Sequence, residues 1–144
     1  LVKNFSNTFG AQALVASIDY KFLNSKPVIF KDRARKKIDT DIFNVCKKIE
    51  NFVGEILLTC IENEGMNNGY ELETLGKLSN MLSIPIIAFG GAFEKEHFYK
   101  GFKYGASAVA AANYFHYKEF STYLIKDYLK SKNIILRKYE DYIL

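Results

Sequence analysis

Residues 54–70 read Gly-Glu-Ile-Leu-Leu-Thr-Cys-Ile-Glu-Asn-Glu-Gly-Met-Asn-Asn-Gly-Tyr. In this stretch a short apolar segment is followed directly by an acidic segment that contains glycine. Three consecutive apolar residues without alternation, residues 56–58, are typical of a strand that is covered on both faces, as in a parallel sheet. Polar side chains gather where this strand ends, and parallel α/β proteins carry their chemistry at such strand ends. The stretch therefore predicts an α/β protein with a functional site at this edge of its sheet.

The same order of strand and helix recurs along the chain. Four predicted strands are each followed by a segment with helical spacing of apolar residues, which demands a parallel sheet with right-handed crossovers. We predict half of a TIM (β/α)8 barrel, built from four βα units, with residues 1–144 as a single half-barrel domain. Because four strands leave open sheet edges, the chain is expected to be a fragment of a longer (β/α)8 protein. The predicted strands are residues 13–18, 55–59, 84–89 and 107–111, and the predicted helices are residues 40–53, 72–82, 93–99 and 119–130. Thr40 or Asp41 can cap the first of these helices, and residues 101–105 are predicted as a turn with a glycine at each end.

Composition narrows the class of protein. The chain has 144 residues, of which 49% are hydrophobic, enough for one domain with a buried core. Its apolar runs are shorter than the roughly 18 to 20 residues of a membrane span, and no secretory signal is visible, so we expect a cytoplasmic protein without a membrane partner. Cys46 and Cys60 lack the spacing of a metal site and are expected to be reduced thiols. We expect no metal and no cofactor.

Residues 20–31 are predicted as a hairpin, and a basic cluster follows it. The net charge of +4 is mild and acidic residues interrupt the cluster, so nucleic acid is not an expected partner. Two alternatives remain for the cluster: a solvated loop, or a surface that attracts a phosphorylated substrate. The cluster consists of Lys31, Arg33, Arg35, Lys36 and Lys37.

Two glycine- and alanine-rich segments at neighbouring strand ends predict a phosphate site. Gly90 and Gly91 stand where a strand gives way to a helix, so backbone N–H groups and the helix dipole can face an anion. Residues 111–113 (Ala-Ala-Asn) follow the next strand, and the loops after the last two strands of a β/α barrel frequently hold a phosphate. A phosphate site is favoured over two plain turns.

Carboxylates follow two of the predicted strands. Asp19 is a candidate general acid or base, with a hairpin cap as the alternative. For Glu64 three roles stay open: a carboxylate in the catalytic mouth, a partner of the phosphate loop, or a solvated charge. Glu62 is expected to be solvated, Cys60 to be a packed thiol, and His97 to be structural or exposed and not catalytic.

Several motifs together resemble one family. Residues 10–19, 54–61 and 85–91, with Gly65 and the pair Phe115-His116, follow the order found in the cyclase subunit of imidazole glycerol phosphate synthase, of histidine biosynthesis. The resemblance extends to about residue 136 and covers the C-terminal half of that family's barrel. It implies a (β/α)8 lyase that joins ammonia, supplied by a glutaminase subunit, to a phosphoribulosyl-formimino aminoimidazole carboxamide ribonucleotide. The implied products are imidazole glycerol phosphate and an aminoimidazole carboxamide ribotide.

The resemblance also implies residue roles. Asp19 matches one catalytic carboxylate, whose family partner lies on a strand outside this chain. Thr59 matches a residue that lines the polar mouth of the barrel. Glu55, at the other end of the same strand, matches a residue of the charged gate through which ammonia enters. The residues matched to binding of a substrate phosphate are Glu64, Gly65, Gly90, Gly91, Ala112 and Asn113.

Departures from the family pattern keep two other functions open. Residues 62–66 read Glu-Asn-Glu-Gly-Met where the family usually has Asp-Arg-Asp-Gly-Thr, and Phe89 stands where a small residue is usual. Such differences are compatible with a cyclase-like paralogue that works with a glutaminase to amidinate a surface sugar. The third alternative is a half-barrel that binds a phosphorylated ligand without catalysis, or that pairs with itself.

Overall fold

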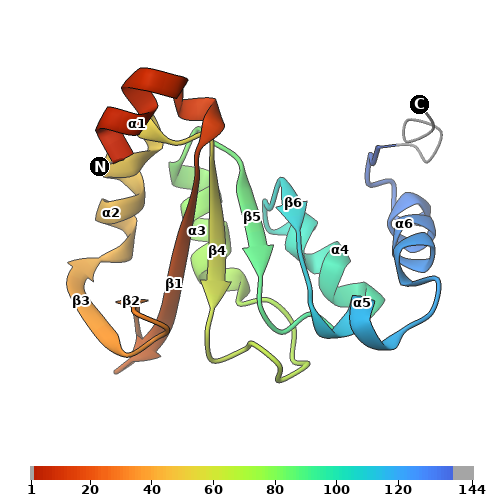
Figure 1. Ribbon diagram of the computed structural model, residues 1–144. Helices are drawn as coiled ribbons and strands as arrows, with labels where there is room; N and C mark the ends of the chain where they lie inside the picture. Colours follow the sequence, from red (N-terminus) through yellow and green to blue (C-terminus); the bar gives the residue numbers. More distant parts are fainter. Residues whose placement is uncertain (1, 138–144) are drawn as a thin grey trace.

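A single six-stranded sheet organises the molecule in the computed structural model, which describes residues 2–137 (Figure 1). Leu1 and residues 138–144, which the predicted domain includes, lie outside the described residues. The strand order is β3-β2-β1-β4-β5-β6; β1, β4, β5 and β6 are parallel, and β2 and β3 are antiparallel. The strands are β1 (Val15–Leu23), β2 (Lys26–Lys31), β3 (Lys36–Asp41), β4 (Glu55–Cys60), β5 (Ile86–Phe89) and β6 (Ala108–Val109).

Helices connect the parallel strands. The carboxylate of Asp41 accepts a hydrogen bond of 2.9 Å from the backbone N–H of Asn44, so this residue caps α2, one of the two caps that the sequence favours. The helices are α1 (Val2–Phe9), α2 (Ile42–Ile49), α3 (Leu72–Met81), α4 (Lys95–Lys103), α5 (Asn113–Tyr117) and α6 (Ser121–Ser131), with 3₁₀ turns η1 (Ala11–Ala13) and η2 (Glu50–Phe52).

The helices cover one face of the sheet. Ile56, Leu58 and Cys60 of β4 alternate with the residues of the other face and are buried against the helices. In Figure 1, α3 lies behind β4 and β5 on this covered face. The core residues that share it come from β1, β5, α2, α3, α4 and α6, among them Ile18, Tyr20, Ile86, Ala88, Ile42, Cys46, Leu75, Leu78, Phe98 and Leu129.

The opposite face has no helical layer among the described residues, and we call it the uncovered face. Register places Asp19 of β1 beside Thr59 of β4, and Thr59 beside Phe89 of β5. Paired residues of parallel strands point to the same side, so these three side chains form a row across the sheet. Val15, two pleats before Asp19 on the same face, is 55% exposed. The row lies near the carboxyl edge of the parallel strands.

Four strand-to-helix units therefore make up the chain, as predicted: β1 leads to α2, β4 to α3, β5 to α4, and β6 to α6. The predicted excursion after the first strand is also present, but it is larger than expected. It adds two strands, β2 and β3, to the free edge of β1, and the basic cluster lies at the exposed turn between them.

Some predicted boundaries were wrong. The first strand does not end before Asp19 but runs on to Leu23, because β2 continues to pair with it beyond the last residue of β4. Helix α4, which was predicted to end at residue 99, extends to Lys103, so Gly101 lies inside it and not in a turn. A Cβ at Gly101 would come within 2.8 Å of Val109 and 3.0 Å of Tyr70, which explains glycine at a helical position. Residues 113–117 form the short helix α5, which was not predicted.

Candidate functional site

The carboxyl edge of the parallel strands brings Asp19 and Thr59 together. Although β1 continues beyond it, Asp19 lies one residue before the last parallel pair, Tyr20 with Cys60. The hydroxyl of Ser17, on the same face, donates to Oδ1 of Asp19 over 3.4 Å. Thr59 is buried beside it. The predicted catalytic carboxylate therefore lies on the uncovered face, held by pairing with strands on both sides.

A loop that we call the acidic loop, residues 61–71, follows β4. Its first turn closes through the backbone N–H of Asn63, which donates to the Cys60 carbonyl over 3.2 Å. Farther along, the Asn63 amide donates to the Gly69 carbonyl over 2.9 Å, and the Gly69 N–H donates to the Gly91 carbonyl over 2.9 Å. These bonds join the acidic loop directly to the Gly-Gly segment after β5.

A small open depression, with about 10 Å³ available to the centre of a water-sized sphere, lies where these loops meet, and we call it the Gly91 pocket. Five of the six residues predicted to bind phosphate line it. Gly90 does not, because its α-carbon packs against the Cys60 carbonyl, to which an added Cβ would come within 2.8 Å. The full lining is Glu64, Gly65, Asn67, Phe89, Gly91, Ala92, Ala111, Ala112 and Asn113. Ala111 belongs to the predicted segment 111–113 and Ala92 directly follows Gly91, whereas sequence reasoning missed Asn67 and Phe89 as lining residues.

The sequence profile of the histidine biosynthesis protein family matches residues 1–121. The chain belongs to the histidine biosynthesis protein family. Its relatives include subunit HisF of imidazole glycerol phosphate synthase from Endomicrobium trichonymphae, 45% identical over 142 residues, which are 96% of this chain and 54% of that protein. The same subunit from Lachnoclostridium phytofermentans is 40% identical over 141 residues (95% and 55%), and that from a Thermotoga species is 35% identical over 138 residues (95% and 54%).

The chain spans about half the length of these curated relatives of the histidine biosynthesis family. Together with four βα units around a parallel sheet, this supports the predicted architecture, an α/β half of a TIM barrel. Within residues 2–137, no helix is long and apolar enough to cross a bilayer. In the same range, no group of three or more His, Cys, Asp or Glu side chains is arranged to hold a metal ion.

Charge in the Gly91 pocket is unusual for a predicted phosphate site. The lining holds one carboxylate, Glu64, and no lysine or arginine. Glu64 is an exposed residue, but partial desolvation of its carboxyl group and, second, the negative charge of Asp19 raise its pKa above the ordinary value. A protonated Glu64 can donate a hydrogen bond to an anion, whereas an ionised Glu64 repels it. Backbone N–H groups and the Asn67 and Asn113 amides are the other donors that the pocket offers.

We expect the affinity of the pocket for inorganic sulfate, whose charge is constant between about pH 4 and pH 8, to fall as Glu64 ionises. At pH 8 the complete protein should bind sulfate about fivefold more weakly than at about pH 4, since one like-charge repulsion of about 1 kcal/mol is added. Glu64→Gln should bind with the same affinity at both pH values. Calorimetric titration measures this, and Asp127→Asn, which removes a carboxylate from an exposed position outside the pocket, is the control. Affinity of the unchanged protein that is equal at both pH values would contradict the assignment.

Glu55 lies far from this pocket. It starts β4, pairs with Val15, and lies four residues before Thr59, so both side chains point to the uncovered face about 13 Å apart. The predicted gate residue thus occupies the opposite end of the face that carries Asp19. Between these ends the face presents Ser17, Leu57 and Ile87.

Glu62 is exposed, in agreement with the prediction that it is solvated, but its carboxylate also bonds within the protein. Its Oε2 accepts a hydrogen bond of 2.7 Å from the backbone N–H of Phe22, in the extension of β1. His97 is structural, as predicted: its Nδ1 accepts from the backbone N–H groups of Phe93 and Glu94 at the start of α4. Cys60 is buried, and burial raises the pKa of its thiol, which suits a packed thiol better than a nucleophile.

Proposed function

We propose that this chain is the C-terminal half of the cyclase subunit of imidazole glycerol phosphate synthase, an ammonia-dependent lyase of histidine biosynthesis. The observation that carries the proposal is the position of Asp19. It lies at the carboxyl edge of the parallel strands, beside Thr59, in a chain of the histidine biosynthesis family whose relatives include HisF subunits. The complete protein is then a (β/α)8 barrel, and its activity belongs in the cytoplasm.

In this proposal Asp19 transfers protons during the cyclisation. A carboxylate fixed in a strand can take a proton from a reacting group and return it later in the reaction. A second carboxylate is needed on the opposite side of the substrate, and the other half of the barrel supplies it. Ser17, which donates a hydrogen bond to Asp19, helps to orient the carboxylate.

A glutaminase subunit supplies the ammonia at the end of the sheet where Glu55 lies. From there ammonia moves along the inner face of the closed barrel, past Ser17, Leu57 and Ile87, to Asp19. These side chains carry no charge, so the path excludes acids that would protonate ammonia and trap it as ammonium. The Gly91 pocket holds one phosphate of the substrate.

The test is ammonia-dependent turnover of the histidine-pathway intermediate by the complete protein, with its upstream half restored and the intermediate saturating. Formation of imidazole glycerol phosphate supports the proposal. A folded protein that binds the intermediate but does not turn it over contradicts it.

One observation favours a second candidate, the cyclase-like paralogue that delivers ammonia for amidination of a surface sugar. Phe89, at a position where the family usually has a small residue, lines the Gly91 pocket. The two functions are separated by supplying a glutaminase with either acceptor, the histidine-pathway intermediate or a sugar nucleotide. Transfer of ammonia-derived nitrogen to the sugar alone would establish the paralogue.

A further inference from the structure

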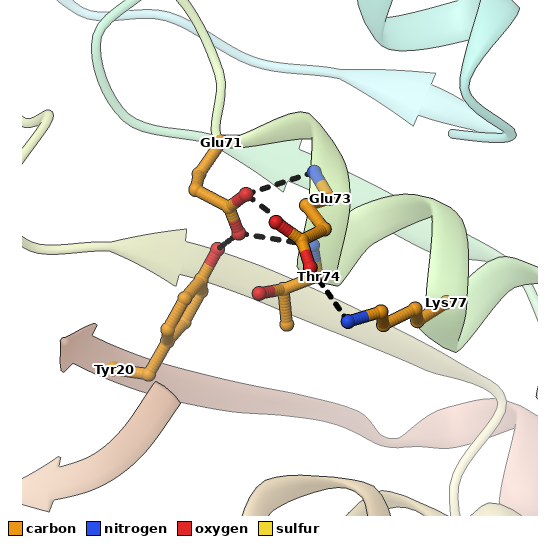
Figure 2. Close-up of polar contacts among 5 residues, drawn as sticks. All are labelled: Tyr20, Glu71, Glu73, Thr74 and Lys77. Atoms are coloured by element: carbon orange, nitrogen blue, oxygen red, sulfur yellow. Dashed lines mark hydrogen bonds and ion pairs between the residues drawn. The ribbon is translucent and has the colours of Figure 1, made fainter. Parts of the chain in front are cut away.

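Tyr20 joins the strand that carries Asp19 to the far end of the acidic loop. It follows Asp19 directly in β1, so the two side chains point to opposite faces of the sheet. The Tyr20 side chain is 1% exposed, and its hydroxyl donates to Oε2 of Glu71 over 2.8 Å (Figure 2). Glu71 ends the acidic loop and immediately precedes α3.

Glu71 is held from a second side by the helix that it caps. Its Oε1 accepts from the backbone N–H of Glu73 over 2.8 Å, and its Oε2 accepts from that of Thr74 over 3.0 Å (Figure 2). The capping bonds fix the carboxylate to α3. The bond from Tyr20 then fixes the same carboxylate to β1, so one side chain connects a strand and a helix that belong to different βα units.

The beginning of the acidic loop is attached to the same short piece of β1. The Ile61 N–H donates to the Tyr20 carbonyl over 2.9 Å, and the Phe22 N–H donates to Glu62 over 2.7 Å. Residues 20–22 therefore hold both ends of the acidic loop, with Glu64 between the two attachments. The rings of Tyr20 and Phe22 also meet edge to face, with centroids 6.1 Å apart.

We propose that Tyr20 is a positioning residue, which fixes the acidic loop, and with it Glu64 and Gly65, relative to Asp19. The catalytic consequence rests on the proposed function, whereas the placement of the loop rests on the contacts above. Since Tyr20 and Asp19 are consecutive, a displacement of β1 carries the loop with it. The position of the Gly91 pocket relative to the carboxylate of Asp19 thereby stays constant.

The chemistry of the contact suits a permanent link. Burial and, second, the negative charge of Glu71 raise the pKa of Tyr20, so the hydroxyl keeps its proton and remains a donor. A hydrogen bond from a buried neutral donor to a carboxylate is among the stronger single bonds in a protein. Phenylalanine in its place keeps the packing of the ring and removes only this bond.

The experiment compares the complete protein with its Tyr20→Phe variant in two measurements at fixed pH. Inorganic phosphate is titrated to give a dissociation constant, and the carboxyl carbon resonance of Glu64 is followed by NMR. We expect phosphate to bind about tenfold more weakly, and the Glu64 resonance to move toward that of a free carboxylate. If the complete protein turns over the intermediate, KM should rise about tenfold and kcat should fall less. A purely structural role would lower the melting temperature and leave these properties of the folded protein unchanged.

Lys77→Met is the matched control. It removes the ion pair of 2.6 Å between Lys77 and Glu73, which lies on the exposed side of α3 and does not reach β1 (Figure 2). This variant should match the unchanged protein in both measurements.

If Tyr20→Phe does not fold, Glu71→Asp takes its place. A shorter carboxylate still caps α3 but no longer reaches the Tyr20 hydroxyl, so the same changes are expected. An unmoved Glu64 resonance together with unchanged phosphate affinity, in whichever variant folds, overturns the proposal. The Glu64 resonance tests the positioning role of Tyr20 even if the complete protein shows no turnover or binds no phosphate. Failure of the proposed function can therefore be told apart from failure of this inference.

Discussion

Asp19→Asn is expected to lower the ammonia-dependent turnover of the complete protein by about two to four orders of magnitude, the usual contribution of a general acid or base. Asparagine has nearly the same shape and still accepts a hydrogen bond from Ser17. Its amide cannot take up and return a proton at neutral pH. The loss should therefore appear in kcat, with little change in KM.

Folding of this variant should be almost unchanged. The backbone of Asp19 is paired with Thr59 on one side and with Phe30 on the other, and neither pairing involves the carboxylate. We expect the free energy of unfolding to change by less than about 0.5 kcal/mol, as for substitutions away from the core. Asp39→Asn, in the exposed strand β3, is the control for the loss of one negative charge. Turnover of Asp19→Asn within threefold of the unchanged protein would remove Asp19 from the catalytic step.

The parts of the fold that follow from local sequence were predicted. Consecutive apolar residues identified β4, although helices bury only Ile56 and Leu58 among them and Leu57 lies on the uncovered face. Asp41 was one of two predicted caps for α2, since its carboxylate can reach the first free N–H groups of the helix. Most residues of the Gly91 pocket could be grouped from the sequence because they follow three successive parallel strands, β4, β5 and β6, which lie side by side in the sheet.

The missed features depend on contacts between distant residues. Glu62 binds the Phe22 backbone, 40 positions away, and Glu71 binds Tyr20, 51 positions away. Every residue except proline has a backbone N–H, so the sequence does not indicate which one Glu62 binds. A glutamate before a helix is interpreted as an ordinary helix cap. The length of β1 was missed for a related reason: its second half is stabilised by β2, after the parallel partner has ended. The position of Phe89 beside Thr59 follows only from the register.

Gly91→Ala should cause the largest loss of stability among the substitutions considered, about 3 kcal/mol or more. Gly91 has a φ of +90°, where a residue with a Cβ is strained by about 1–2 kcal/mol. The added Cβ would also lie 2.5 Å from the Gly69 carbonyl oxygen and 2.9 Å from the Asn63 carbonyl oxygen, far inside van der Waals contact. Both atoms belong to the acidic loop, so the loop must move away and lose its hydrogen bond between Gly69 and Gly91.

Gly65→Ala is the control that distinguishes backbone strain at a positive φ from a steric clash of the added Cβ. Gly65 also has a positive φ, +75°, but an added Cβ would meet nothing within 4 Å. The free energy of unfolding of this variant should fall only by the cost of strain, about 1–2 kcal/mol, and the hydrogen bonds between the acidic loop and Gly91 should remain.

Chemical denaturation gives the free energies of unfolding of both variants, and titration with inorganic phosphate gives both affinities. Gly91→Ala should bind phosphate at least tenfold more weakly than Gly65→Ala, because only the first change moves one wall of the pocket away from the other. Equal losses of stability and of phosphate affinity in the two variants would mean that backbone strain alone is responsible and that the acidic loop does not pack against Gly91.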